Sequence, residues 1–446
     1  MKLVDYYQKK LKDLKDQNLY RQTQEINAFD AINVVKNYHQ NLVQEKLTVK
    51  NLTQNSSNLF AELIKKTSEK SPEKLLKKLL EKLPKKLSQK LSQKSSKKLQ
   101  NNSQEKPQIA KKLISFASND YLDLSGNKLV KKSAIDAIKK YGVGARSSRY
   151  ISGNNQLYHQ LEKALAQWKN CDDSLIFSSG YLAGIGIIPA LAGKGDLIIA
   201  DKLIHSCLLD GIKLSQAKLI RFKHNDFEDC KKILQQNRIN FQRCLIITET
   251  IFSMDGDLGC VVELKNLASE FSCLLLTDDA HGLGIKLFDE EISSPNHLQM
   301  GTFSKAFGSL GGYVCGDKII IDYLRNFAKS QIYSTALPPS ILASCIASLK
   351  IISQKKLGQK ALENAQYFCQ LMNLKQPSSA IIVIIVENNE KLLAIVKNVE
   401  QQGFLISAIR KPTVSTPRIR ITFNSTHQKN QIKKLASILK TLLKKI

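Results

Sequence analysis

The feature that most constrains the fold is a series of short apolar runs that begins after residue 113. Helical, charged segments separate most of these runs, which cover residues 175–177, 197–200, 245–248, 274–277 and 313–315. Short continuous apolar strands are typical of sheets that are covered on both faces, and their alternation with helices is typical of parallel sheets. The sequence therefore predicts an α/β fold with a mostly parallel central sheet.

The rest of the chain divides by pattern. The large α/β domain is predicted over 113–338, and a long helix, an apolar run at 380–386 and further helix and strand segments predict a smaller α+β domain over 339–446. Residues 1–35 read as a polar helical arm, in which Leu11, Leu14 and Leu19 form a weak apolar stripe.

Between these parts, residues 36–112 form a low-complexity insert rich in Lys, Gln and Ser. Leucines recur there at every fourth position, as at 75, 79, 83, 87 and 91, and Pro84 interrupts the run. A period of four drifts by about 40° per step around a helix of 3.6 residues per turn, so no single face stays apolar. We expect a disordered or partly helical insert in preference to a basic helix on a membrane surface.

Composition excludes several classes of protein. The net charge of +28 is unevenly spread, since residues 61–112 alone hold sixteen Lys and five Glu, but no basic patch interleaved with aromatic residues suggests nucleic-acid binding. A hydrophobic fraction of 43% and a mean hydropathy of −0.22 predict a soluble globular protein, and no apolar run is long enough to span a membrane. The N-terminus has no apolar signal segment, and the nine scattered cysteines predict reduced thiols, no metal site and a cytoplasmic location.

Lys305 lies in the tight stretch Gly301-Thr-Phe-Ser-Lys-Ala-Phe-Gly308, and Asp278 and His281 precede it at the end of an apolar run. A pyridoxal phosphate ring needs an amine for its Schiff base and a carboxylate that keeps the pyridine nitrogen protonated. His281 can in addition reach the ring hydroxyl. The alternative for Asp278, a cap of the next helix, leaves the lysine loop unexplained. The pattern therefore predicts a site for pyridoxal 5'-phosphate.

Four further residues in three segments fit such a site. Gly180 and Tyr181 follow an apolar run and open a helix, where backbone N–H groups bind phosphate, although small-residue turns of this kind are common. His205 could lie flat on a ring, or could be an ordinary packed or exposed histidine. Ser253 follows another strand-like run and could donate a hydrogen bond to the ring.

From residue 113 to its end the chain resembles the α-oxoamine synthase family of fold-type I pyridoxal phosphate enzymes. The matching motifs occur in the order of that family: Ser118-Asn-Asp-Tyr-Leu122, Ser178-Ser-Gly-Tyr181, Phe222-Lys-His-Asn-Asp226, Phe252-Ser-Met-Asp-Gly-Asp257, Asp278-Asp-Ala-His-Gly282, Thr302-Phe-Ser-Lys-Ala-Phe-Gly308 and Ile332-Tyr-Ser-Thr335. One departure is Asp123, which stands where the family usually has Gly, so that turn must avoid a left-handed conformation or tolerate strain.

The resemblance implies catalytic roles. Lys305 would form the Schiff base and act as the base, Asp278 would pair with the ring nitrogen, and His281 with the ring hydroxyl. His205, the fourth catalytic residue, would stack on the ring, and further cofactor contacts are implied for Gly180, Tyr181, Ser253 and Thr302. Ser334 and Thr335 would reach the phosphate of a neighbouring subunit, which implies a homodimer with shared active sites.

The resemblance also bears on the substrates. The segments 408–414 and 418–422 are similar to those of family members that join L-alanine to a pimeloyl thioester, carried by CoA or by acyl carrier protein, in biotin synthesis. Arg21, His205, Arg410 and Thr413 would then contact substrate. Two alternatives stay open: another synthase of the family, of the glycine C-acetyltransferase or 5-aminolevulinate synthase type, or a non-catalytic relative that binds acidic partners through its basic insert.

Overall fold

A computed structural model describes residues 11–17, 26–28, 33–36, 111–285 and 296–444. The insert predicted over 36–112 lies outside the described residues, apart from the last residue of β2 (Asn33–Lys36) and the start of β3 (Lys111–Ser115). In the range 1–35, where a helical arm was expected, residues 11–16 are helical, but β1 (Ile26–Ala28) and β2 are strands. Ile26 and the pair Val34-Val35 are β-branched and favour extended backbone, which explains why a helix was the wrong expectation there.

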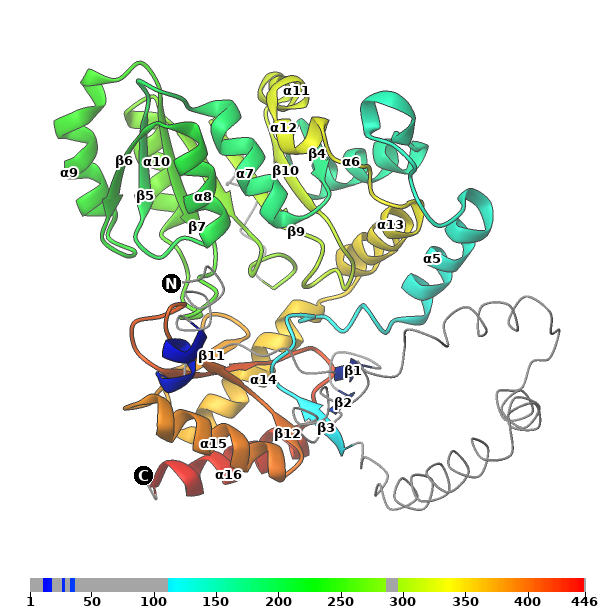
Figure 1. Ribbon diagram of the computed structural model, residues 1–446, viewed down its shortest axis with the longest axis vertical. Helices are drawn as coiled ribbons and strands as arrows, with labels where there is room; N and C mark the ends of the chain where they lie inside the picture. The colour runs from blue at the N-terminus through cyan, green and yellow to red at the C-terminus, as the bar shows by residue number, and fades with distance from the viewer. Residues whose placement is uncertain (1–10, 18–25, 29–32, 37–110, 286–295, 445–446) are drawn as a thin grey trace, which may run out of the picture. The chain divides into compact units, whose positions relative to one another are not determined.

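A seven-stranded sheet forms the core of the predicted large domain (Figure 1). Its strands, in spatial order, are β4 (Asp173–Phe177), β10 (Gly312–Gly316), β9 (His297–Thr302), β8 (Leu274–Asp278), β7 (Cys244–Glu249), β5 (Leu197–Asp201) and β6 (Lys218–Phe222). Neighbouring strands from β9 to β6 pair in parallel, whereas β10 is antiparallel to both its neighbours. The mostly parallel α/β sheet is confirmed; β6 and β9 are strands that the apolar runs do not predict.

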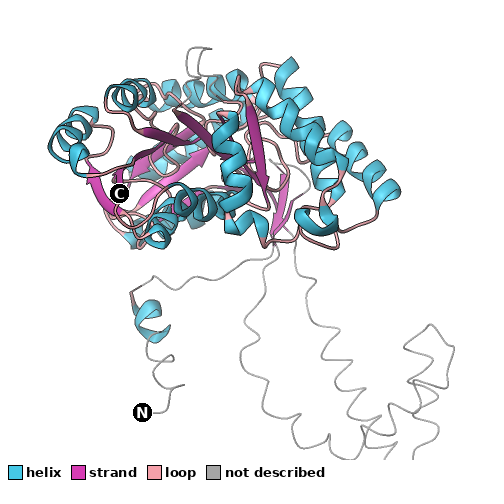
Figure 2. Ribbon diagram, turned by 90° about the horizontal axis from the view of Figure 1, so that it is seen from above, coloured by secondary structure: helices cyan, strands magenta, loops and turns pink. Residues whose placement is uncertain are grey.

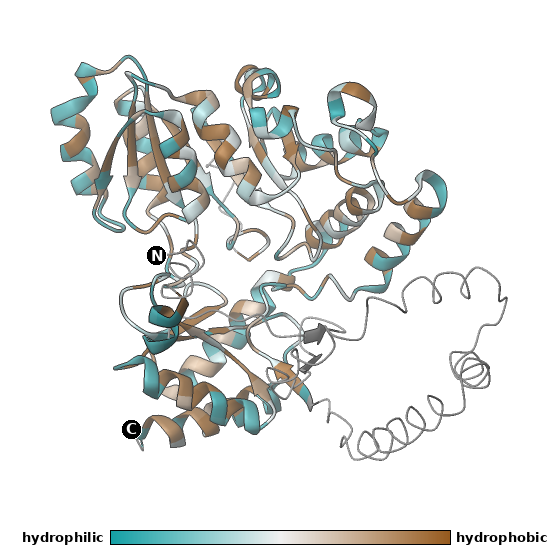
Figure 3. Cartoon of the chain, viewed as in Figure 1, coloured by the Kyte–Doolittle hydropathy of each residue, from teal (hydrophilic) through white to brown (hydrophobic). Residues whose placement is uncertain are grey.

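Helices cover both faces of this sheet (Figure 2). One face packs against α7 (Gly180–Leu191), α8 (Ser206–Ser215), α11 (Lys318–Phe327) and α12 (Lys329–Ile332). The other face packs against α6 (Gln156–Trp168), α9 (Phe227–Asn237) and α10 (Val261–Glu270). The central strands are apolar along their length while the helices alternate between apolar and polar faces, as expected for a doubly covered sheet (Figure 3).

The C-terminal part contains a three-stranded antiparallel sheet in the order β11 (Ile381–Ile385), β14 (Arg418–Thr422) and β13 (Ser407–Ile409). The remaining elements are α5 (Lys128–Tyr141), η1 (Arg149–Gly153), η2 (Arg238–Asn240), α13 (Pro339–Gln354), α14 (Leu357–Met372), α15 (Asn389–Gln401), β12 (Phe404–Leu405) and α16 (Lys429–Lys444). Two helices, α13 and α14, stand where one long helix was expected. β12 pairs in parallel with β3, which ties the chain before the large sheet to the C-terminal part.

Asp123, which stands where the family usually has glycine, adopts a left-handed backbone conformation. Its φ is 57°, so the turn keeps the left-handed conformation that glycine would adopt without strain. The Asp123 carboxylate accepts a hydrogen bond from Thr426 Oγ1 at 2.9 Å. This hydrogen bond with the C-terminal part offsets the backbone strain at Asp123. A side chain without an acceptor group would not form it.

Two findings concern the described residues as a whole, namely the length of their helices and the state of their cysteines. No helix among the described residues is long and apolar enough to cross a bilayer. The nine cysteines all lie in described segments and are free there.

A buried ion pair fixes β4, the strand that leads into the Gly180 turn. Glu162 of α6 accepts both guanidinium N–H groups of Arg149, at 2.6 and 3.0 Å, and also the backbone N–H of Ile176 at 3.1 Å. We expect Glu162→Ala to lower the free energy of unfolding by about 3 kcal/mol, because Arg149 and the strand amide both lose a buried acceptor.

Chemical denaturation of Glu162→Ala measures this loss. Glu363→Ala removes an exposed carboxylate of α14 and serves as the control, with an expected change within about 0.5 kcal/mol. Equal stabilities of the two variants would contradict the role given to the Arg149–Glu162 pair.

Candidate functional site

A pocket of about 260 Å³ opens at the carboxyl ends of the parallel strands. The sequence-predicted residues among its lining are Gly180, Tyr181, His205, Asp278, His281, Thr302 and Lys305. Ligands of open α/β sheets bind at this edge, because loops and helix N-termini converge there. Seven predicted positions that span 126 residues of sequence, from 180 to 305, therefore come together in one cavity.

Lys305 lies in the loop between β9 and β10. The loop is closed by a hydrogen bond from Gly308 N–H to the carbonyl of Lys305 at 2.8 Å. Gly308 has a φ of +61°, and a Cβ there would lie 2.2 Å from the backbone nitrogen of Ser125, so only glycine fits. The close approach of these two backbone segments holds the lysine loop in place.

Asp278 and His281 reach the pocket from the end of β8. One carboxylate oxygen of Asp278 accepts the backbone N–H of Ala280 at 2.9 Å, which fixes the turn that carries His281. His281 Nε2 lies 2.8 Å from Lys305 Nζ. The histidine therefore contacts the amine of Lys305 directly.

The N-terminus of α7 forms one wall of the pocket. Ser179 caps the helix by accepting the N–H of Leu182 on its Oγ at 3.1 Å. The N–H groups of Gly180 and Tyr181 occupy the first helical positions, where they point out of the helix end and favour an anion. A Cβ on Gly180 would lie 3.0 Å from Thr302 Cβ, so glycine keeps this corner open.

His205 caps α8, which packs against α7. Its Nδ1 accepts the N–H of Cys207 at 3.2 Å, which orients the ring toward the pocket. Burial lowers the pKa of His205 below its ordinary value. A neutral imidazole at this place can stack on a flat ring without repelling a cation.

Burial shifts every titratable group of the pocket centre. It lowers the pKa of the Lys305 amine, although Asp278 and Glu249 oppose the shift. It raises the pKa of Asp278, while the charge of Lys305 acts in the opposite direction. Burial also holds the pKa of His281 well below its ordinary value, and Lys305 and Arg420 lower it further. Such clustered shifts are typical of catalytic sites.

Glu249 is a site residue that the sequence pattern does not predict. It ends β7, pairs in register with Asp278 of β8, and lines the pocket. Its Oε1 has no hydrogen-bond partner among the described residues, and burial, followed by the charge of Asp278, raises its pKa well above normal. The signal was present, because Glu249 closes an apolar run just as Asp278 does.

Asp279 is the second residue that was missed. It points away from the pocket and accepts Lys169 Nζ at 2.7 Å and Thr250 Oγ1 at 2.8 Å. It is 2% exposed, so both contacts are made away from water. They fix the turn between Asp278 and His281 from behind.

A chain of polar contacts supports His281 from the side of the C-terminal part. Tyr121 Oη lies 2.6 Å from His281 Nδ1, and Arg420 of β14 donates to Tyr121 Oη at 3.2 Å. Arg420 also donates to Asn119 Oδ1 at 3.1 Å. Tyr121 and Asn119 belong to a recognised motif, but nothing in the sequence pairs them with a residue 300 positions away.

Other predicted residues do not line the pocket. Ser253 contributes its carbonyl to Arg420, and Thr335 contributes its carbonyl to Ser178 Oγ at 3.0 Å. Ser334 Oγ donates within its own turn to the carbonyl of Ser330. The lining also lacks Arg410 and Thr413 of the segment after β13, and Arg21 lies outside the described residues.

The residues present fit pyridoxal phosphate on their own geometry. Lys305 provides a partly buried amine with a lowered pKa, and Asp278 a buried carboxylate within the same cavity. The α7 N-terminus provides an anion site at the wall. Oε1 of Glu249 has no hydrogen-bond partner among the described residues, so those residues alone do not satisfy the polar lining.

Comparisons with known proteins agree with this reading. The family model for aminotransferase class I and II matches residues 111–439. The 8-amino-7-oxononanoate synthase of Beijerinckia indica subsp. indica is 41% identical over 344 residues, covering 75% of this chain and 89% of the relative. The protein of the same name from Methylobacterium nodulans is 40% identical over 333 residues, covering 74% and 87%.

Solved structures give the same picture. The crystal structure of 8-amino-7-oxononanoate synthase from Francisella tularensis has a TM-score of 0.63 and 29% identity, and covers 74% of this chain and 98% of that one. Serine palmitoyltransferase from S. paucimobilis matches with a TM-score of 0.72, 24% identity and coverage of 75% and 88%, which supports the fold. The chain belongs to the aminotransferase class I and II family, and its cofactor is pyridoxal phosphate.

Proposed function

We propose that this chain catalyses the decarboxylative condensation of L-alanine with a pimeloyl thioester, which gives 8-amino-7-oxononanoate in biotin synthesis. The observation that carries the proposal is the single pocket in which the amine of Lys305 lies beside His281 and shares its lining with Asp278. The names of the relatives that cover about three quarters of this chain support the choice of substrates.

Each polar group of the pocket has a defined task in this reaction. Bound pyridoxal phosphate supplies an electron sink for the carbanion at the Cα of alanine. Asp278 would keep the ring nitrogen protonated, and His281, which contacts Lys305, would hydrogen-bond the ring hydroxyl. His205 would stack on the ring, and the N–H groups of Gly180 and Tyr181, with Thr302, would hold the phosphate.

Lys305 moves the proton. Burial lowers the pKa of its amine, so a larger fraction is neutral and basic near neutral pH. Lys305 would hold the cofactor through this amine and, once alanine is bound in its place, would take the Cα proton. The carbanion attacks the thioester carbonyl, the thiol leaves, CO₂ is lost, and a proton returns to Cα.

Substrate recognition is assigned to residues that are not among the pocket lining. We assign the contacts with the carboxylate and acyl groups of the substrates to Arg410 and Thr413, and to Arg21 of the N-terminal segment. The first two follow β13 in the C-terminal part, a turn in which Thr413 N–H donates to the carbonyl of Arg410 at 3.1 Å. The thioester carrier is CoA or an acyl carrier protein.

The same proposal includes a cytoplasmic homodimer built from a large domain at 113–338 and a small domain at 339–446. The apolar side chains of Val143, Ile151 and Tyr333 are 76%, 81% and 81% exposed, which is unusual for large apolar groups and supports a covered surface. Tyr333 directly precedes Ser334 and Thr335, the residues that we assign to the neighbouring subunit's phosphate site.

We predict that Lys305→Ala abolishes the visible absorption of the lysine-bound cofactor and reduces activity by at least about 10⁴-fold, because no other amine replaces the nucleophile and base. Absorption spectra and CoA release measure both. Lys305→Arg should fail equally, since a guanidinium stays protonated, while Lys194→Ala, an exposed lysine, should behave as the wild type. A visible band that survives in Lys305→Ala would refute the assignment.

We predict that alanine with pimeloyl-CoA or pimeloyl-acyl carrier protein gives a kcat/KM at least about tenfold above any pairing of glycine or alanine with acetyl-CoA or succinyl-CoA. Thiol release and CO₂ release from each pair provide the comparison. Preference for glycine with succinyl-CoA or acetyl-CoA would replace the proposal by a different synthase of the family. A protein that binds the cofactor but releases no thiol from any pair would favour a non-catalytic relative.

We predict that mixing two inactive variants restores activity if active sites are shared between subunits. A dimer of Lys305→Ala with a Ser334→Ala/Thr335→Val subunit contains one site with both defects and one intact site. Random exchange then gives about a quarter of the wild-type number of sites. CoA release after joint refolding measures the recovery, and activity no greater than that of either parent would place Ser334 and Thr335 in their own subunit's site or outside any site.

A further inference from the structure

A hairpin at residues 251–258 follows β7 of the seven-stranded sheet and contacts the three-stranded C-terminal sheet. Ile251 and Leu258 form an antiparallel bridge at its base. Within it, Phe252 N–H donates to the carbonyl of Asp257 at 3.0 Å and Gly256 N–H donates to the carbonyl of Phe252 at 2.8 Å. Ser253, which we assign to the cofactor, lies inside this hairpin.

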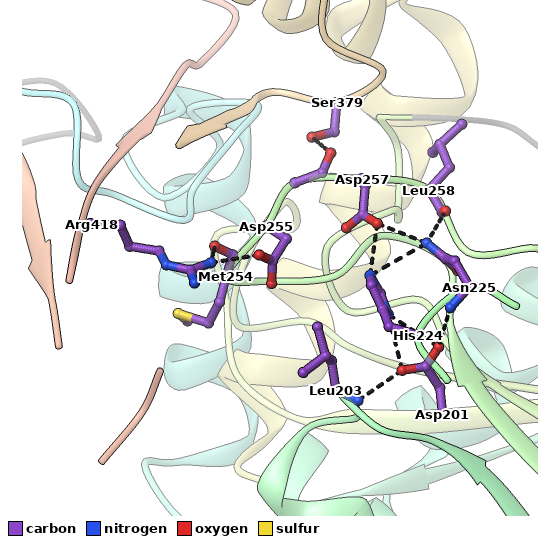
Figure 4. A network of polar contacts seen from close by, with 11 residues as sticks. Asp201, Leu203, His224, Asn225, Met254, Asp255, Asp257, Leu258, Ser379 and Arg418 are labelled. Carbon is purple, nitrogen blue, oxygen red and sulfur yellow. Dashed lines mark hydrogen bonds and ion pairs between the residues drawn. The ribbon is translucent and has the colours of Figure 1, made fainter. Parts of the chain in front are cut away.

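The tip of the 251–258 hairpin contacts the C-terminal sheet. Arg420 of β14 donates to the carbonyl of Ser253 at 2.7 Å, and Arg418 donates to the carbonyl of Met254 at 3.1 Å. Arg418 is also paired with the carboxylate of Asp255. Ser379 Oγ, just before β11, donates to the carbonyl of Gly256 at 2.6 Å (Figure 4). The backbone of the tip is thus an acceptor surface for the C-terminal sheet.

The base of the hairpin is held by the residues that follow β5 and β6. Asp201 ends β5 and is fully buried, and its carboxylate accepts the N–H groups of Leu203 and Asn225 at 2.7 and 2.8 Å. Asn225 donates from its side chain to Asp257 at 2.7 Å and to the carbonyl of Leu258 at 2.9 Å (Figure 4).

His224 bridges the two carboxylates of this cluster. Its Nδ1 lies 3.0 Å from Asp201 Oδ1, and its Nε2 lies 2.8 Å from Asp257 Oδ2. A carboxylate only accepts, so both ring nitrogens must carry a proton, and either neutral form would set a lone pair against an anion. The edge contact with Phe252, at 4.4 Å between ring centroids, completes its surroundings.

We propose that His224, as an imidazolium between Asp201 and Asp257, is a positioning residue that fixes the 251–258 hairpin. Through the hairpin it sets Ser253 and the two arginines of β14, and through Arg420 and Tyr121 it sets His281 beside Lys305. His224 is not among the pocket-lining residues, so it acts through these contacts and not on the reacting atoms. The catalytic part of this inference rests on the proposed function.

The charge of His224 agrees with this role. Burial alone would lower its pKa, but the hydrogen bonds and charges of Asp201 and Asp257 outweigh burial and raise the pKa to about 10. These two aspartates are the charged groups that face the ring, from β5 and from the hairpin. Because the folded-state pKa is raised, the stabilisation is complete below the ordinary pKa of histidine and is lost as the pH rises through about 10.

Amide hydrogen exchange of the full chain, with and without bound pyridoxal phosphate, tests the inference. In His224→Gln, which can bridge only one carboxylate by donation, the amides of Phe252 and Gly256 should exchange at least about tenfold faster than in the wild type. Amides in the interior of β8 should keep their rates. His159→Gln removes an exposed histidine of α6 and should leave the hairpin rates unchanged within about twofold.

The cofactor provides a second measurement. Titration of His224→Gln with pyridoxal phosphate, followed by absorbance, should show a dissociation constant raised by at least about tenfold, since Ser253 and His281 are less well placed. Hairpin exchange needs neither cofactor nor substrate, so it can succeed if the proposed reaction is wrong. The substrate assay can equally succeed if the hairpin result fails.

Asp257→Asn decides the matter if His224→Gln does not fold. This variant keeps the Asp201–His224 pair but removes one carboxylate, so protection of the hairpin, corrected for intrinsic exchange, should fall at a lower pH than in the wild type. Unchanged hairpin exchange in both variants would overturn the inference. So would an equal acceleration of all amides, since that indicates a global loss of stability and not a local hold on the hairpin.

Discussion

The parallel register of β5, β7, β8 and β9 is the constraint on which the site depends. These strands end at Asp201, Glu249, Asp278 and Thr302, each a polar residue at the end of a strand whose residues are almost all buried. Parallel pairing brings their carboxyl ends to one edge, and a slip by a single residue would turn every one of these side chains to the other face. The position of the cofactor site thus follows from hydrophobic burial in the sheet before any polar contact is considered.

Burial is also what gives the site its chemistry. Asp278 and Glu249 are buried and Lys305 is partly buried. Burial raises the pKa of both carboxyls and lowers that of the amine, and the charges of the amine and the carboxylates oppose these shifts in each other. A cavity with two carboxyls and one amine favours neutral forms until a charged ligand enters. A cofactor with a protonated ring nitrogen and an anionic phosphate would complete this charge balance.

The sequence predicts those parts of the site that are local. Lys305, Asp278 and Gly180 stand at strand ends or in glycine-rich turns, so their neighbours along the chain reveal their role. The contact of Tyr121 with Arg420 cannot be found in this way, because it depends on how the C-terminal sheet packs against the large one. The sequence does not predict short strands such as β1 for a different reason. Three residues carry too little periodicity to compete with a helical pattern nearby.

The two adjacent aspartates show how little a motif says about the task of each member. Asp278 faces the pocket, whereas Asp279 faces Lys169 and Thr250, because successive side chains at a strand end point to opposite sides. The position of Asp279 also explains Gly282, because a Cβ at residue 282 would lie 2.3 Å from the carboxylate of Asp279. The turn that aims His281 at Lys305 is therefore shaped from behind. Asp279, which lies outside the pocket, thus helps to fix the position of Asp278 inside it.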